Sequence, residues 1–530
     1  MLPARPEDGV ASRLKLPLLL LALFVGVSVL TRWLSLVVEL LDMDEAAHIV
    51  GSWVLRDGGR LYRDFVDNKP PLLYAYYALA QALLGRGLPA VHLFTALVWV
   101  PLTALAASAV FRHGRRGLVA GLLHLLYGSA FLAHDMLATN AELVLLLPAA
   151  WAVALLADER RARRPAALLL AGGLLGIATL VKHQAVFWLP ALAWAGASAE
   201  AGAPRLRRAA RGALPLAGFL LPLAATVLAF AAAGGAGELA YWVLLRNWAY
   251  AASPPSAREA LGRAAGSLLP WLLAGAPLWW AWRRTRPLFT PRLRRLLDLL
   301  LALGLLPAFA GLRFFPHYLV PAGFALALGA TPAVASWLER PLPRAGRAFL
   351  AASLGLALGF QAANAALYLG GLGVYRETDP VYRATAARLA RDPCFPGSRL
   401  FVWGWAPAFY YYAGLAGARP ASRFAVMAQA GLTGYVPGNL GSVRRRRPDE
   451  PTLEPSHWAW LMQDLERSRA TYVLDTAPAG LYRWDRYPLR DYPGLDGYLR
   501  RRYQAVDSVS GVTVFRRIGC LAAGRGSPRP

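Results

Sequence analysis

Long apolar runs alternate with short polar connections along the chain as far as Gly370. Runs of about 17 to 25 apolar residues are long enough to cross the hydrocarbon core of a bilayer as helices. By this measure the pattern predicts a polytopic α-helical membrane protein with about eleven transmembrane helices. The helices are expected near residues 15–37, 91–111, 117–133, 142–157, 166–182, 185–200, 213–233, 266–282, 296–312, 318–337 and 348–370.

The polar connections form two groups that alternate along the chain and differ in arginine content. The basic group comprises residues 112–116, 160–164, 205–211, 283–295 and 340–347. The connections that carry few cations are 134–141, 183–184, 234–265 and 313–317, and residues 38–90 are expected on the same side of the membrane as these. Since Lys and Arg concentrate in cytoplasmic loops, we expect a multi-pass protein of the plasma or inner membrane with a cytoplasmic amino terminus. The first run lacks an Ala-x-Ala-like cleavage site, so it is expected to remain as a helix.

Beyond Gly370 the composition changes to Asp, Arg, Tyr, Pro and Gly, and no later run is long enough to span a bilayer. We therefore divide the chain into a membrane domain, 1–370, and a soluble domain, 371–530. Short segments rich in β-branched and aromatic residues predict strands, and helical spacing predicts helices. The strands are expected at 399–403, 471–475 and 512–515, and the helices at 381–391 and 456–467. An odd number of crossings makes this small α/β domain extracytoplasmic.

The two cysteines, Cys394 and Cys520, lie near the start and the end of the soluble domain. An exported compartment permits a disulfide between them. Two buried free thiols are equally compatible with the sequence, because the spacing along the chain does not give the distance between the residues.

Composition supports the membrane assignment. The chain has 530 residues, of which 56% are hydrophobic and 17% charged, and its mean hydropathy is +0.37. Its formal charge of +26 would suggest nucleic acid as a partner of a soluble protein. Here the arginines lie in short clusters between apolar runs instead of on one solvated domain, so we expect no nucleic-acid partner.

Candidate chemistry begins in the first outer loop, residues 38–90, where Asp44 and Glu45 follow an apolar run. Ionisable groups at the mouth of a helix bundle are costly and are therefore functional candidates. Adjacent side chains point in different directions on a helix, which predicts separate roles for the two acids. One suits a general base on an acceptor hydroxyl. His48 shares a helix face with Asp44 and is expected to support it.

Lys69 lies two residues after Asp67 and directly before a Pro-Pro pair. The prolines favour an extended turn that would hold Lys69 near the membrane interface. A lysine there can bind a phosphate or an anionic headgroup. Because tyrosines recur from Tyr62 to Tyr77, simple anchoring by an aromatic belt is an alternative role for this segment.

Together these motifs resemble the opening of GT-C superfamily membrane glycosyltransferases: Asp-Glu after the first helix, then Gly-Gly-x-x-Tyr-Arg-Asp-Phe-x-Asp-x-Lys-Pro-Pro-Leu. The chain is most similar to bacterial relatives of dolichyl-phosphate-mannose protein mannosyltransferases and of the aminoarabinose transferase of lipid A, a family 39-like group. The resemblance continues, over nearly the whole chain, through residues 139–142, 176–184, 313–318 and 399–405.

The resemblance implies inverting transfer of a sugar from a polyprenyl-phosphate donor to an acceptor hydroxyl at the outer face of the membrane. Asp44 would be the general base and Lys69 the ligand of the donor phosphate. Glu45, the other catalytic candidate, is expected from the residues alone to support Asp44, by holding a helix terminus or binding substrate. Asp135 and Glu142 would orient the acceptor or the sugar. The remaining candidates, which would neutralise the leaving lipid phosphate, are Lys182, Arg313, His317 and Tyr318.

No cofactor is required for this reaction, although a divalent metal, with His48 or His317 among its ligands, is an option that the sequence leaves open. Membrane lipid is an expected partner, and the acceptor could be a protein, a lipid or a glycan. A polytopic lipid or glycolipid transporter or flippase is the main alternative, because intramembrane charges also mark transport paths. Transporters often contain repeated halves and broken helices near the midplane, and neither is evident in the sequence.

Overall fold

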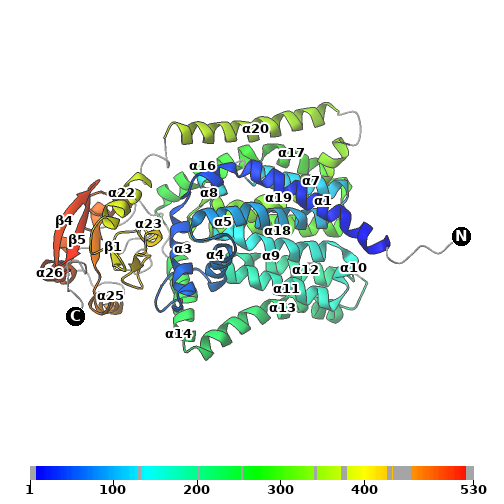
Figure 1. The fold of residues 1–530 in the computed structure, drawn as a ribbon. Coiled ribbons are helices and arrows are strands. Elements are labelled where there is room, and N and C mark those ends of the chain that lie inside the picture. Colours follow the sequence, from blue (N-terminus) through cyan, green and yellow to red (C-terminus); the bar gives the residue numbers. More distant parts are fainter. Residues whose placement is uncertain are drawn as a thin grey trace.

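The computed structural model describes residues 8–128, 133–200, 202–251, 255–338, 343–371, 379–426, 432–433 and 455–520. It consists of a helical bundle with a smaller sheet-containing domain at one end (Figure 1). The bundle's helices, with 3₁₀ and π segments labelled η, are α1 (Asp8–Thr31), α2 (Trp33–Val37), α3 (Met43–Arg56), α4 (Pro71–Leu84), α5 (Leu88–Phe94), η1 (Thr95–Trp99), α6 (Val100–Val110), α7 (Arg115–Tyr127), α8 (Ala133–Leu137), α9 (Ala141–Ala157), α10 (Glu159–Ala162), α11 (Pro165–Val181), η2 (His183–Trp188), α12 (Leu189–Ser198), α13 (Arg205–Ala232), α14 (Ala236–Leu239), η3 (Ala240–Leu245), α15 (Arg246–Ala251), α16 (Ala257–Ala274), α17 (Ala276–Thr285), η4 (Arg286–Leu288), α18 (Pro291–Phe309), η5 (Ala310–Leu312), η6 (Pro316–Leu319), α19 (Val320–Trp337) and α20 (Arg344–Leu369).

Within the described residues, five helices are long and apolar enough to cross a membrane: Leu88–Val110, Arg205–Ala232, Pro291–Leu312, Pro316–Trp337 and Gly346–Leu369. Shorter apolar helices are Lys15–Thr31, Pro71–Leu84, Ala141–Ala157 and Pro165–Val181. One helix is expected at 266–282, but the structure has two helices there. Gly275 ends α16, and a second helix, α17, follows. The number of crossings therefore stays a prediction.

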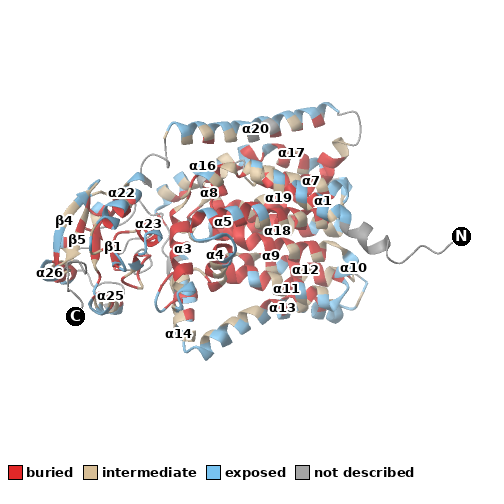
Figure 2. Ribbon diagram, viewed as in Figure 1, coloured by how far each residue is buried: buried red, intermediate tan, exposed pale blue. Residues whose placement is uncertain are grey.

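Small residues bring some of the membrane helices into backbone contact. A Cβ atom added to Gly172 in α11 would collide with the carbonyl of Pro215 in α13, and one added to Gly218 would collide with that of Leu169. Such close approach is the usual basis of helix packing in lipid. Figure 2 shows buried residues filling the bundle, whereas α13 and α20 keep much exposed surface, as expected of lipid-facing helices.

The C-terminal domain contains a five-stranded sheet with the order β2-β1-β3-β5-β4. Its elements are α22 (Asp379–Ala390), β1 (Arg399–Trp403), α23 (Ala408–Leu415), β2 (Arg419–Pro420), α25 (Pro455–Ser468), β3 (Tyr472–Asp475), η7 (Leu481–Arg486), η8 (Leu489–Asp491), α26 (Pro493–Arg502), β4 (Tyr503–Val509) and β5 (Val512–Arg517). Strands β1, β2 and β3 are parallel, and β5 pairs antiparallel with both β3 and β4. The α/β prediction is confirmed, as are the expected strands and helices.

Cys394 and Cys520 form a disulfide, with their Cα atoms 6.2 Å apart. This resolves the choice that the sequence left open between a bridge and two free thiols. The bond joins the segment before β1 to the residues after β5, and so closes the domain.

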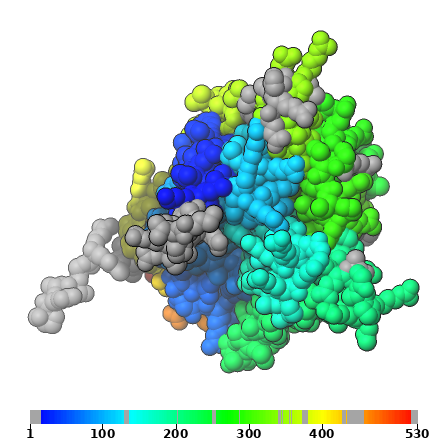
Figure 3. Space-filling model, turned by 90° about the vertical axis from the view of Figure 1, so that its right-hand side faces the viewer, coloured from blue at the N-terminus to red at the C-terminus, as the bar shows by residue number. Residues whose placement is uncertain are grey.

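The two ends of the bundle are distinct. The helix α1 begins at the end opposite the C-terminal domain, whereas α3 and α14 lie at the end near that domain, whose α23 packs against α3 (Figure 1). Figure 3 views the molecule from the end where α1 begins, and there the C-terminal domain is largely hidden behind the bundle. The connection 38–90 is itself structured, because it contains both α3 and α4.

Candidate functional site

The helix α3 begins with a capping box that places the acids of residues 38–90, the first loop. Asp42 accepts a hydrogen bond from the backbone N–H of Asp44 over 2.9 Å. In return, Glu45 Oε2 accepts one from the backbone N–H of Asp42 over 3.3 Å. This arrangement satisfies free donors at the first turn of the helix and fixes Asp44 at its start.

Glu45 is fully buried, and protein groups occupy both of its oxygens. Its Oε1 lies 2.8 Å from His92 Nε2 and accepts the backbone N–H of Thr139 over 2.5 Å. Its Oε2 also accepts the N–H of Leu41 over 3.2 Å. Glu45 therefore joins the start of α3 to the helices beside it, which is a positioning role and leaves no oxygen directed at a substrate.

Asp44 points elsewhere and is accessible, as expected from the angular spacing of adjacent helical residues. Its Oδ2 lies 3.7 Å from Lys69 Nζ, and the side chains are 32% and 17% exposed, respectively. Burial alone would raise the pKa of Asp44, but the nearby positive charges, above all that of Lys69, hold it well below its usual value. The two principal sequence candidates thus meet in space, with Asp44 ionised.

The segment that carries Lys69 is fixed on both sides. Tyr62 donates its hydroxyl hydrogen to the carbonyl of Lys69 over 2.7 Å. Asn247 of α15 donates to the carbonyl of Asn68 over 2.6 Å. Residues 61–69, which we call the Lys69 loop, are therefore held by their own tyrosine and by a segment far along the chain.

The tyrosines of this region lie inside the protein. Tyr62, Tyr74, Tyr76 and Tyr77 are each at most 4% exposed. Tyr74 donates to Asp67 over 2.8 Å, and Tyr77 donates to the carbonyl of Thr139 over 2.7 Å. They pack around α3 and α4, so the alternative of an aromatic belt facing the membrane interface does not describe them.

A second group of predicted residues gathers from four segments of the bundle. Lys182, directly after α11, forms an ion pair of 2.6 Å with Glu142 at the start of α9. His317 Nδ1 lies 2.8 Å from Asp135 of α8, and its Nε2 lies 4.0 Å from Glu142. The Lys182 ammonium also lies over the ring of Tyr318, 4.8 Å from its centre. All five predicted residues therefore form one cluster.

Asp42 connects this cluster to the first loop. Ligand-type atoms of Asp42, Asp135 and His317 all lie within 4.8 Å of one another. Burial, together with the charges of Asp44 and Asp135, raises the pKa of Asp42. Two carboxylates and an imidazole form a donor set that divalent cations accept.

His48, the other histidine considered as a metal ligand, lies apart from this set. It is buried against the edges of Tyr74 and Tyr77. Burial lowers its pKa to about 3, which keeps the ring neutral. Neither ring nitrogen has a hydrogen-bond partner among the described residues.

Arg313 occupies a strained connection between η5 and η6 and is only 1% exposed. The residues on either side, Leu312 and Phe314, have φ angles of 53° and 49°. Left-handed conformations of such residues persist only where the surrounding structure imposes them, and they concentrate at functional sites.

Sequence reasoning missed Asp42, Asn247 and His92 as parts of the site. The signal for Asp42 was present, because three carboxylates occur within four residues at 42–45. Nothing in the sequence around Asn247 or His92 indicates contact with residues 45–69, since both partners are distant along the chain.

The fold is similar to crystal structures of ArnT from Cupriavidus metallidurans. The structure bound to undecaprenyl phosphate has a TM-score of 0.59 and 17% identity, covering 95% of this chain and 99% of that chain. The apo structure has a TM-score of 0.56, 15% identity and the same coverage, 95% and 99%. No family model and no curated protein matches the sequence. These two likenesses show that the chain has an ArnT-like fold, and membership of the GT-C superfamily stays a prediction.

Proposed function

We propose that the protein is an inverting glycosyltransferase that moves a sugar from a polyprenyl-phosphate donor to an acceptor hydroxyl at the outer face of the membrane. The carrying observation is the pairing of an accessible, ionised Asp44 with Lys69, 3.7 Å apart. The cluster around Lys182 and His317 lies in electrostatic range of Asp44. The undecaprenyl phosphate bound to a protein of the same fold supports a lipid-phosphate donor.

In the proposed reaction Asp44 accepts the proton of the acceptor hydroxyl. The acceptor oxygen forms a bond to the anomeric carbon, while the bond from that carbon to the phosphate oxygen breaks. The polyprenyl phosphate leaves with the electron pair, and the configuration at the anomeric carbon is inverted. One base and a stabilised leaving group are sufficient, unlike in a glycosidase, which needs a pair of acids.

Lys69 is proposed to bind the donor phosphate, with Lys182 and Arg313 as further cations on the leaving side. Charge on the phosphate increases as the sugar departs, so fixed cations stabilise the transition state more than the ground state. In the structure the Lys69 ammonium faces Asp44 and the Lys182 ammonium faces Glu142. Donor binding would exchange part of these contacts for contacts to the phosphate.

A divalent metal is a variant of this proposal and is not required by it. Asp42, Asp135 and His317 fit such an ion by their chemistry and spacing. Bound there, a cation would supply further positive charge for the leaving phosphate. Metal analysis of purified protein, compared between wild type and Asp135→Asn, tests this variant: a stoichiometric metal lost in Asp135→Asn supports it, and equal trace amounts refute it.

The test of the proposed function supplies purified protein with radiolabelled polyprenyl-phosphate sugars and membrane extracts that contain protein, lipid and glycan acceptors. Wild type is expected to transfer label, and Asp44→Asn is expected to lose about 10²- to 10⁴-fold in rate, the usual contribution of a general base. Asp57→Asn, at the other end of α3 and 45% exposed, is the matched control and should remain active.

Equal transfer by wild type and Asp44→Asn would refute Asp44 as the base. The competing flippase function predicts that labelled lipid crosses the bilayer of proteoliposomes without sugar transfer. That result would replace the glycosyltransferase proposal.

A further inference from the structure

The C-terminal domain contacts the backbone of the Lys69 loop directly. The backbone N–H of Val66 donates to the carbonyl of Arg423 over 3.0 Å. Val66 is fully buried, and Asp67 and Asn68, which precede Lys69, are 2% and 4% exposed. This contact lies three residues from Lys69, and the residues between them are buried. A displacement of Arg423 would therefore also shift Lys69.

Arg423 is itself held rigidly by Asp464 of α25. Its guanidinium donates twice to the Asp464 carboxylate, each over 2.9 Å. The backbone N–H of Arg423 and the hydroxyl of Ser422 donate to the same carboxylate, each over 3.1 Å. The two charged side chains are only 18% and 10% exposed. Paired charge-assisted hydrogen bonds of this kind give geometric precision, and here they fix the turn at residues 422–424.

A second connection from the same turn reaches the same loop. Phe424 and His457 pack against Trp242 of η3, with the His457 and Trp242 rings stacked 5.2 Å apart. One turn further along this segment, Asn247 bonds the carbonyl of Asn68. The C-terminal domain thus holds residues 66–68 both directly, through Arg423, and indirectly, through Asn247.

We infer that the C-terminal domain helps to form the donor-phosphate site. In this arrangement Arg423 and Asp464 act as positioning residues for Lys69. Asp464 fixes the 422–424 turn, the turn fixes Val66, and the loop then places the Lys69 ammonium beside Asp44. Arg423 and Asp464 act through the backbone and are not expected to touch a substrate. This inference has a structural half, that the C-terminal domain holds the Lys69 loop in place, and a functional half, that this placement is needed for donor binding. Only the functional half rests on the proposed function.

The structural half is tested by hydrogen exchange on the full-length protein in nanodiscs. Asp464→Ala is expected to accelerate exchange in the peptide covering residues 61–69 by about two- to tenfold, the effect of losing roughly one net hydrogen bond. Asp464→Asn keeps an acceptor oxygen and should give a smaller increase. Unchanged exchange of this peptide in a folded Asp464→Ala protein would overturn the inference.

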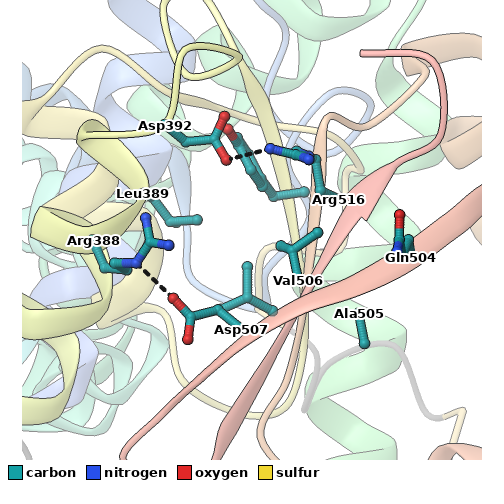
Figure 4. A pocket seen from close by; sticks show the side chains of 10 residues that line it. Arg388, Leu389, Asp392, Gln504, Ala505, Val506, Asp507 and Arg516 are labelled. Carbon is teal, nitrogen blue, oxygen red and sulfur yellow. Dashed lines mark hydrogen bonds and ion pairs between the residues drawn. The ribbon is translucent and has the colours of Figure 1, made fainter. Parts of the chain in front are cut away.

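The matched control is a second Arg–Asp pair of the same domain, at the opposite edge of the sheet. Arg388 and Asp507 lie 2.6 Å apart and line a polar cavity of about 350 Å³ beside α22 and β4 (Figure 4). The Asp507→Ala substitution removes an ion pair of the same residue types, whose side chains are more exposed at 49% and 28%, and should leave exchange at residues 61–69 unchanged. Equal acceleration by both variants would indicate general loosening of the domain and would refute a specific connection.

The functional half is tested by steady-state transfer. Asp464→Ala should raise KM for the polyprenyl-phosphate donor by about five- to tenfold and leave KM for the acceptor unchanged, with Asp464→Asn in between. A changed acceptor KM with an unchanged donor KM would contradict the inference and assign the domain to the acceptor. If wild type transfers no sugar, the proposed function fails, while hydrogen exchange still decides whether this domain holds the Lys69 loop.

Discussion

Asp44 and Glu45 are adjacent, yet the structure gives them different surroundings. Glu45 is fully buried and accepts hydrogen bonds from backbone N–H groups of Leu41, Asp42 and Thr139. Asp44 is accessible beside Lys69. Loss of charge at Glu45 should therefore lower stability, and activity with it, whereas loss of charge at Asp44 should lower the rate of transfer at unchanged stability.

We predict that Glu45→Gln lowers thermal stability and transfer activity together. A glutamine has a single acceptor oxygen, so its NH₂ group must face at least one of the buried N–H donors now satisfied by Glu45. Each unsatisfied buried donor costs about 1–3 kcal/mol. Thermal unfolding in detergent should show a lower midpoint for Glu45→Gln and an unchanged one for Asp44→Asn. A Glu45→Gln protein with normal stability and selectively lost transfer would instead give Glu45 a direct catalytic role.

The separation of the two acids was predictable, because it follows from the angular period of a helix. Their partners were not. Glu45 contacts His92, 47 residues away. Another acid of the same segment, Glu39, accepts a hydrogen bond from Tyr411 of the C-terminal domain, 372 residues away. A single sequence contains no information on which distant residues pair. The direction in which each acidic side chain points from the helix could therefore be predicted, but the residues around it could not.

At the scale of elements, strands β1, β3 and β5 were recognisable because they are short runs of β-branched and aromatic residues. Strand β4 was missed, since its sequence Tyr-Gln-Ala-Val-Asp-Ser-Val leaves most positions exposed or half-buried and its pairing shifts register between Ala505 and Asp507. The helix α23 was missed as well. Its Tyr411 donates to Glu39 and stacks on Trp53, and that packing against the connection 38–90 could not be inferred from local pattern.

Strand β3 ends in an acid whose burial makes the stability of the domain pH-dependent. Burial raises the pKa of Asp475 from 3.8 to about 6, although the N–H of Ala477 donates to the carboxylate. The folded domain thus binds this proton more tightly than the unfolded chain does. The contribution of Asp475 to the free energy of unfolding is therefore highest below pH 3.8 and falls as the pH rises to about 6. Above that pH it is lower by about 3 kcal/mol.

Asp475→Asn should therefore stabilise the C-terminal domain at pH 7.5 and lose this advantage near pH 4. Asparagine keeps an acceptor oxygen for Ala477 without the buried charge. Thermal unfolding followed by tryptophan fluorescence at both pH values measures the effect. Asp496→Asn, which removes an exposed pair with Arg500, should change little at either pH. A midpoint for Asp475→Asn below that of wild type at pH 7.5 would contradict the argument.

The disulfide is the other element-scale determinant of this domain. It closes a sequence separation of 126 residues, and loss of a native bridge of this kind typically costs about 2–5 kcal/mol. The double variant Cys394→Ser/Cys520→Ser should unfold its C-terminal domain at lower temperature. Reductant should reproduce this shift in wild type and have no effect on the double variant. A wild-type transition that is insensitive to reductant would contradict the prediction.

At the scale of the whole molecule, independent features predict one orientation in the membrane. The amino-terminal helix begins at the end of the bundle opposite the C-terminal domain, and α10, which overlaps the basic connection 160–164, is at that same end (Figure 1). The positive-inside rule makes this end cytoplasmic. The disulfide lies in the domain at the other end, and disulfides persist in oxidising compartments outside the cytoplasm.

We accordingly predict that the C-terminal domain is extracytoplasmic and that the Asp44–Lys69 site opens on the same side. Alkaline phosphatase fused after the last residue should be active, because that enzyme matures only outside the cytoplasm, and green fluorescent protein fused there should be dark. Phosphatase fused in the basic connection 160–164 should be inactive, which controls for leakage. The opposite pattern would place both the site and its donor in the cytoplasmic leaflet, where nucleotide sugars could compete as donors, and would require a different account of the substrate.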